Sequence, residues 1–152
     1  MKILDLLDKE AIITDLKATN KMGVIEELIT PISQITQTDK TELIRVIMSR
    51  ERLGSTGIGD GVGIPHGKLK NLPALVLGFG LSRKGVDFES IDGKRTYIFF
   101  LLLTPEDAAG LHLKLLARIS RLLKNDLFRQ QLIDAQNSDE VYAVIQSSDE
   151  DF

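Results

Sequence analysis

A histidine set in a run of glycines is the feature of this sequence best suited to chemistry. The segment 54–68 reads Gly-Ser-Thr-Gly-Ile-Gly-Asp-Gly-Val-Gly-Ile-Pro-His-Gly-Lys, with His66 near its end. Glycine allows backbone conformations and close approaches that a side chain would prevent. A neutral imidazole with a pKa near 6.5 is a competent nucleophile at physiological pH. The segment therefore predicts that another molecule comes close to His66.

Glycine-rich segments often bind phosphate, but the known nucleotide motifs do not fit this one. A P-loop requires glycine where Val62 stands and a hydroxyl residue where Leu69 stands. The dinucleotide pattern G-x-G-x-x-G fails in every register, because Val62, Ile64 or His66 occupies the last glycine position. Nucleotide binding is disfavoured, and phosphoryl transfer to the histidine is the chemistry that remains.

Two further side chains could support such a transfer. Phosphoryl transfer is catalysed mainly by positioning and by neutralising charge. Arg50 ends the helix predicted before the glycine segment, and His112 lies in the first turn of the helix predicted after Pro105. A forked guanidinium, a second imidazole and the backbone N–H groups of the loop would together form an anion-binding site.

The same residues carry a resemblance to a known family. The runs 50–59 and 64–68 resemble the phosphorylation-site segment of type-2 enzyme IIA domains. These domains belong to the phosphoenolpyruvate-dependent phosphotransferase system, in its fructose, mannitol and nitrogen-regulatory family. The similarity continues through 85–88 and 104–113 into the last helices, so it covers nearly the whole chain.

The resemblance implies a role for each site residue. His66 would accept a phosphoryl group from the phosphocarrier protein HPr or its nitrogen-branch counterpart. His112 would face it and help to bind the group, and Arg50, sixteen positions before His66, would contribute charge. No cofactor or metal is implied, because the phosphoryl group is carried on the histidine. The family's phosphoryl-binding loop would comprise Ser55, Thr56, Gly57 and Gly67.

Two hypotheses about function follow from the resemblance. The first is a phosphoryl carrier, which in sugar-transporting members passes the group to a IIB domain. The second is a regulatory module whose phosphorylation state controls binding to target proteins. The stand-alone chain and the runs 54–59 and 86–93 favour the nitrogen-regulatory branch, while the fructose and mannitol type is kept as the alternative.

Simpler interpretations exist for each residue. The glycine run could be a flexible connector, and His112 a core or capping histidine on an apolar helix. Arg50 could only favour the dipole at its helix C-terminus. A zinc site built from His66, His112 and Asp60 is a further possibility, although neither histidine has a metal-ligand spacing. Asp60 also introduces a negative charge that could weaken phosphoryl binding or the docking of an acidic donor.

Composition narrows the class of protein. The 152 residues are 43% hydrophobic and 27% charged, with a net charge of -3 and a pI of about 5.4, which disfavours nucleic acid and anionic membranes as partners. The absence of cysteine excludes disulfides and thiolate chemistry. The apolar run 97–103 is too short to span a bilayer, and the start has no signal core. We expect one cytoplasmic domain over 1–152.

Hydrophobic periodicity predicts a three-layer α/β/α sandwich with a mixed central sheet. Expected strands cover 11–16, 74–81, 86–91 and 96–103, with a hairpin turn at 92–93. Asn20 caps a first helix, which Pro31 should kink or split and whose inward face comprises Met22, Ile25, Leu28, Ile29 and Ile32. Further helices are expected over 39–52, 111–123 and 126–135, with Gly54 as the stop of the first of these. A last helix starts at Asn137 with a capping box to Glu140, and 146–152 is expected to fray.

Overall fold

Two long central strands organise the fold, which a computed structural model describes for residues 1–151. β5 (Val76–Val86) and β6 (Thr96–Pro105) pair antiparallel. The sheet has the order β1-β5-β6-β3-β2, with β4 also pairing with β6. β1 is parallel to β5, while β3 and β4 are parallel to β6, so the sheet is mixed. The remaining strands are β1 (Leu7–Ile13), β2 (Gly57–Gly59), β3 (Val62–Gly63) and β4 (His66–Leu69).

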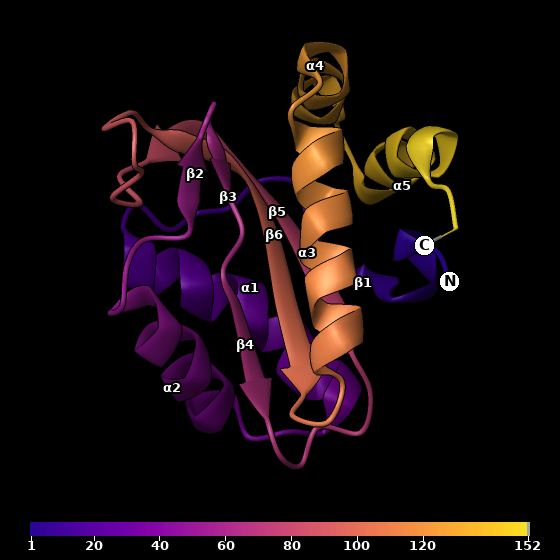
Figure 1. Ribbon diagram of the computed structural model, residues 1–152. Helices are drawn as coiled ribbons and strands as arrows, with labels where there is room; N and C mark the ends of the chain where they lie inside the picture. Colours follow the sequence, from indigo (N-terminus) through magenta and orange to yellow (C-terminus); the bar gives the residue numbers. More distant parts are fainter. Residues whose placement is uncertain (152) are drawn as a thin grey trace.

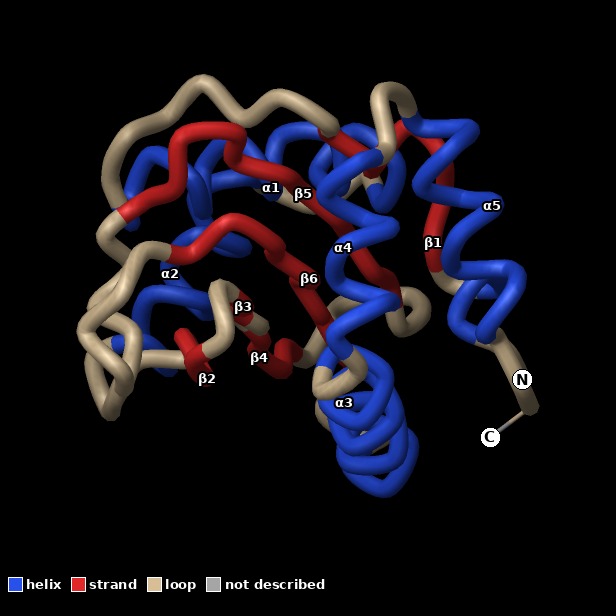
Figure 2. Tube along the Cα trace, turned by 90° about the horizontal axis from the view of Figure 1, so that it is seen from above, coloured by secondary structure: helices blue, strands red, loops and turns tan. Residues whose placement is uncertain are grey.

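Helices cover both faces of this sheet, which confirms the predicted α/β/α sandwich (Figure 1). On one face lie α1 (Lys21–Thr36) and α2 (Lys40–Glu51). Figure 2 shows the other helices grouped away from these two. They are α3 (Ala109–Leu123), α4 (Asp126–Asp134) and α5 (Ser138–Ser148), and a short 3-10 turn, η1 (Ile3–Asp5), precedes β1. No helix among residues 1–151 is long and apolar enough to cross a bilayer.

Alternation along β5 directs its residues to the two helical layers. A Cβ on Gly78 or Gly80 would lie only 2.8 Å from Ile32 or 2.7 Å from Leu28 of α1, so the two glycines allow that helix to pack directly on the strand. Phe79 points to the opposite layer and meets Phe100 edge to face at 5.0 Å.

The predicted strand 86–91 is wrong, as is the short hairpin that closed on it. β5 runs unbroken to Val86, where it still pairs with Thr96, and residues 87–91 form a loop. The alternation that suggested a strand reflects burial of Phe88, which packs on Phe99 at 5.1 Å. A buried side chain on a loop produces the same local pattern as a half-buried strand.

Several boundaries also differ from expectation. β1 begins at Leu7 and ends at Ile13, earlier than the predicted 11–16. Asn20 caps α1 as predicted by accepting a hydrogen bond from Gly23, but Met22 is exposed. α1 is not split: the helix continues through Pro31 to Thr36. Proline removes one backbone donor from the helix, and the packing of the buried stripe of α1, which includes Leu28 and Ile32, compensates for that loss.

The predicted frayed end is wrong for residues 146–149, and Phe152 lies outside the described residues. α5 continues to Ser148, and the carboxylate of Asp149 accepts hydrogen bonds from the backbone N–H groups of Ile3 and Leu4, both at 2.9 Å. The capping box at the start of α5 is only half formed. Asn137 accepts from the N–H of Glu140, but the Glu140 carboxylate accepts from the N–H of Gln136 instead of Asn137.

Candidate active site

A cavity with a volume of about 640 Å³ lies between α2, β4 and the start of α3. Its walls come from three segments distant in sequence. These lining residues are Arg45, Val46, Ser49, Arg50, Leu53, His66, Gly67, Lys68, Glu106, His112, Leu113 and Leu116. The cavity therefore brings together His66, His112, Arg50 and Gly67, four of the seven site residues predicted from the sequence.

His66 is placed by the register of β4 against β6. It pairs with Leu102, and residues paired across a sheet point to the same face. That face carries α3, which brings the imidazole opposite His112. Gly67 points the other way, where a Cβ would lie 2.5 Å from Cγ1 of Val46 on α2. The glycine is required because the strand packs this closely against the helix.

A hydrogen bond fixes the tautomer of His66. Its Nδ1 lies 2.8 Å from the carbonyl oxygen of Ile64. A carbonyl can only accept, so Nδ1 carries the proton and Nε2 of the neutral ring keeps its lone pair. Partial burial lowers the pKa of His66 below 6.5, while the bond to Ile64 acts in the opposite direction and Arg50 adds to the lowering. The neutral, nucleophilic form is thus the one present at pH 7.

His112 lies beside His66, with the ring centroids 5.5 Å apart and the planes at 57°. The residue is 4% exposed, and its Nδ1 lies 2.6 Å from Oγ1 of Thr104. Burial, together with the neighbouring His66 and Lys68, lowers the pKa of His112 to about 4. This ring is therefore neutral at physiological pH and can act as a hydrogen-bond donor without adding charge.

Positive charge in the cavity comes from Arg50 and Lys68, and from Arg45, which is paired with Glu42. Nη1 of Arg50 donates to the carbonyl oxygen of Gly54 at 2.8 Å, which holds the guanidinium at the end of α2. Lys68 follows His66 by two residues along β4, and its charge lowers the pKa of both histidines. Lys68 was not predicted from the sequence, although the alternation of a strand puts residues 66 and 68 on one face.

The other three predicted residues, Ser55, Thr56 and Gly57, do not line the cavity. The hydroxyl of Ser55 donates to the carbonyl oxygen of Phe88 at 2.8 Å and accepts from the N–H of Gly57 at 3.0 Å. A Cβ on Gly57 would lie 2.9 Å from the backbone of Ser90. These residues attach the glycine segment to the 87–91 loop.

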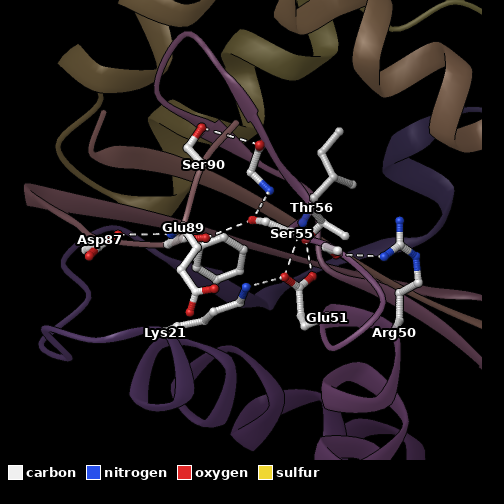
Figure 3. Close-up of polar contacts among 12 residues, drawn as sticks. Lys21, Arg50, Glu51, Ser55, Thr56, Asp87, Glu89 and Ser90 are labelled. Carbon is white, nitrogen blue, oxygen red and sulfur yellow. Dashed lines mark hydrogen bonds and ion pairs between the residues drawn. The ribbon is translucent and has the colours of Figure 1, made fainter. Parts of the chain in front are cut away.

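Thr56 belongs to a buried ionic network centred on Glu51 (Figure 3). The Glu51 carboxylate accepts hydrogen bonds from the Thr56 N–H at 3.2 Å and from the Thr56 hydroxyl, and pairs with the ammonium group of Lys21 at 2.8 Å. Thr56 in turn accepts from the N–H of Ile64 at 3.0 Å, and Ile64 accepts from His66. A continuous chain of contacts therefore connects Lys21 to the imidazole.

The sequence contained two signals for features that we did not predict. Leu43, Ile47 and Glu51 form an i, i+4 series, so a carboxylate occupies the buried stripe of α2 and needs partners. Asp60 and Gly61 form a hairpin dipeptide between β2 and β3, and both have positive φ, 55° and 76°. The glycine segment is thus three short strands and not an extended loop.

Asp60 is exposed at this turn and does not line the cavity. Its backbone N–H donates to Asp92 at 3.3 Å. The zinc site considered from the sequence therefore lacks its carboxylate. Among residues 1–151 no group of three or more histidine, cysteine, aspartate or glutamate side chains is arranged to hold a metal ion.

Comparison with known families agrees with this fold. Residues 5–148 match the family described as phosphoenolpyruvate-dependent sugar phosphotransferase system, EIIA 2. The chain belongs to this family of enzyme IIA domains.

The similar proteins include nitrogen regulatory proteins and a fructose-specific phosphotransferase component. A nitrogen regulatory protein of Bradyrhizobium diazoefficiens is 39% identical over 145 residues, which cover 95% of each chain. The fructose-specific EIIABC component of Bacillus subtilis is 36% identical over 98% of this chain, which spans only 24% of that longer protein. The crystal structure of nitrogen regulatory protein IIA-Ntr from Neisseria meningitidis has a TM-score of 0.89 at 30% identity, covering 93% of this chain and 97% of that one.

Proposed function

We propose that this enzyme IIA domain carries a phosphoryl group on Nε2 of His66. The observation that carries the proposal is the Nδ1–H bond from His66 to Ile64, at 2.8 Å, which leaves Nε2 unprotonated in a half-buried ring that lines the cavity. Without that bond the nucleophilic nitrogen would exchange between two positions.

In the proposed step, the Nε2 lone pair forms a bond to phosphorus while the bond between phosphorus and the donor's nitrogen breaks. The donor ring carries a proton on its other nitrogen, so it keeps the electron pair of the breaking bond and leaves as a neutral imidazole. The Nδ1 proton of His66 remains in its bond to Ile64 and stabilises the positive charge that develops on the ring. No proton has to leave His66 during the transfer, so the step needs no general base.

The charge of the phosphoryl oxygens is met by groups on three sides of the cavity. Arg50 contributes from α2 and Lys68 from β4, and His112 contributes an N–H from α3. Ser55, Thr56 and Gly57 take no direct part in this proposal. They hold the glycine segment, and through Ile64 they hold His66.

The donor we propose is a histidine phosphocarrier of the HPr type, in its nitrogen-branch form. Similarity to the nitrogen regulatory proteins over almost the entire chain supports this branch. Phosphorylation would then regulate binding to target proteins, because it adds negative charge to a cavity lined by Arg45, Arg50 and Lys68. The alternative is transfer to a IIB domain for fructose uptake, which the fructose-specific relative supports. In either case we propose one cytoplasmic domain over residues 1–152.

Reconstituted transfer tests the proposal. The protein is incubated with phosphoenolpyruvate, enzyme I and either HPr or its nitrogen-branch counterpart, and is then analysed by intact mass and peptide mapping at alkaline pH. We expect one acid-labile phosphoryl group on the peptide that contains His66, and none on a His66→Gln variant. Phosphorylation of that variant, or a folded wild-type protein that accepts nothing from either donor, would overturn the proposal.

The bonded nitrogen and the branch are tested separately. Nitrogen-15 NMR of the phosphorylated protein distinguishes Nε2 from Nδ1 phosphohistidine. A faster reaction with the nitrogen-branch donor and no onward transfer to a fructose-type IIB domain would support the regulatory branch. Rapid transfer to the IIB domain would favour the sugar-transport alternative.

A further inference from the structure

The partner of His112 lies behind the second imidazole, and its role is assigned neither by the family nor by the sequence. Thr104 is the ninth residue of β6, and its side chain is completely buried. Its Oγ1 lies 2.6 Å from Nδ1 of His112, a buried contact between two side chains. No other hydrogen bond of this hydroxyl is found among the residues that the structure describes.

We infer that Thr104 is a positioning residue: its hydroxyl donates to Nδ1 of His112 and so holds the ring with its proton on Nε2. The inference deepens the proposed phosphoryl transfer and rests on it for its functional consequence.

Hydrogen-bond accounting selects this direction of the bond. If the hydroxyl donates to Nδ1, its single proton is satisfied and the Nε2–H of His112 remains on the cavity side of the ring. If Nδ1–H donated instead, the Thr104 hydroxyl proton would be buried without an acceptor, which is unfavourable. The second arrangement would also leave a bare lone pair at Nε2 of His112, which repels phosphoryl oxygens.

The two imidazoles would then be held in opposite tautomers. His66, bonded through Nδ1–H to Ile64, offers a lone pair at Nε2. His112, accepting at Nδ1 from Thr104, offers a proton at Nε2. With ring centroids 5.5 Å apart, one ring can attack phosphorus while the other donates to an oxygen of the same group. Since both rings are neutral at pH 7, this complementarity depends on the tautomers and not on charge.

The first measurement is made on the unphosphorylated protein and needs no transfer activity. Long-range 1H–15N correlation spectra of protein labelled at histidine nitrogen report which nitrogen carries the proton. The chain has only two histidines, so a His66→Ala variant assigns both sets of signals. We expect a protonated Nε2 and an unprotonated Nδ1 on His112. A protonated Nδ1 would overturn the inference whether or not the protein is ever phosphorylated.

The second measurement compares Thr104→Val with Thr104→Ser. Valine keeps the shape and removes the hydroxyl, so His112 loses its tautomer preference. We expect transfer to His66 to slow about 10-fold, less than the ~10²–10³ loss typical when a donor is removed outright. Serine retains the hydroxyl and should restore both the spectrum and most of the rate. A valine variant with the wild-type tautomer and rate would contradict the assigned role.

These results separate the inference from the proposed function. If wild-type protein accepts no phosphoryl group but carries a proton on Nε2 of His112, the proposed function is overturned and the tautomer assignment stands. If it is phosphorylated normally but carries the proton on Nδ1, the proposed function stands and the role of Thr104 is overturned. Circular dichroism of each variant confirms folding, and the wild-type spectrum tests the inference even where the valine variant fails to fold.

Discussion

Lys21 at the start of α1 and Glu51 at the end of α2 form an ion pair of 2.8 Å in which the carboxylate side chain is 1% exposed and the lysine side chain 12%. The pair holds two helices together, and Glu51 also bonds to Thr56 of the glycine segment. Its lysine also lies over the ring of Phe88, with Nζ 4.8 Å from the ring centroid. Both charges are therefore compensated within the protein.

Removing one member of this pair should destabilise the fold strongly. Lys21→Met would leave the Glu51 charge buried and unpaired, which costs about 3–5 kcal/mol. The measurement is the free energy of unfolding in urea. The matched control is Lys40→Met, which breaks an exposed pair with Glu26 and should cost less than about 1 kcal/mol. Equal losses of stability in the two variants would mean that the buried pair contributes no more than the exposed pair.

Stability should also depend on pH through His112. The pKa of His112 is lowered to about 4 in the folded protein, so the unfolded chain binds more protons between pH 4 and about 6.5. Stability attributable to this group is therefore complete above pH 6.5 and lost as pH falls toward 4. Because each tenfold change in proton affinity corresponds to about 1.4 kcal/mol, the loss is roughly 3 kcal/mol. His112→Gln should flatten the curve in this window, and an unchanged slope would contradict the prediction.

Gly67 should tolerate a methyl group only if Val46 is reduced. A Cβ at position 67 would lie 2.5 Å from Cγ1 of Val46 and 3.5 Å from its backbone. Gly67→Ala should therefore cost about 1–3 kcal/mol, and the Val46→Ala background should recover part of that loss. A double-mutant cycle by urea denaturation measures the coupling. Strictly additive effects would show that the strand and helix do not meet at this point.

The two hydrogen bonds that Asp149 accepts from η1, called here the Asp149 clamp, should contribute measurably to stability. Asp149→Asn removes the charge from an acceptor of two backbone N–H groups, those of Ile3 and Leu4, and should cost about 1–2 kcal/mol. The control is Asp151→Asn, where an exposed carboxylate meets the amino terminus at 3.4 Å and little change is expected. Hydrogen exchange at Ile3 and Leu4 should quicken in the first variant and not in the second.

The sequence predicted the layers of the fold, and it singled out the two histidines that the structure brings into one cavity, because both inferences depend on local signals. Apolar periodicity placed the helices, and a histidine flanked by proline and glycine identified His66. The sequence could not predict that the glycine segment forms β2, β3 and β4, since glycine has little strand propensity and their pairing depends on β6. Ser55 and Thr56 were assigned to the phosphoryl-binding loop from the resemblance alone, and no local pattern showed that they bond to Phe88 and Glu51 instead of lining the cavity.

Long-range partners account for the remaining differences. The sequence of residues 146–151 is polar and suggests a solvated end. The Asp149 carboxylate, however, accepts a hydrogen bond from the backbone N–H of Leu4, which is 145 residues away in the sequence. Lys68 and Thr104 acquire their places through the register of β4 on β6, which pairs the two residues directly. No local pattern contains that information.

The clamp between Asp149 and η1 brings the two ends of the chain to one corner of the molecule (Figure 1). That corner lies beside β1, at the edge of the sheet opposite the strands that carry the cavity. Three strand spacings, roughly 14 Å at about 4.8 Å each, separate β1 from β4. A domain tethered to either end would be anchored at the far edge of the sheet, and its linker would have to cover at least this distance to bring the domain to His66.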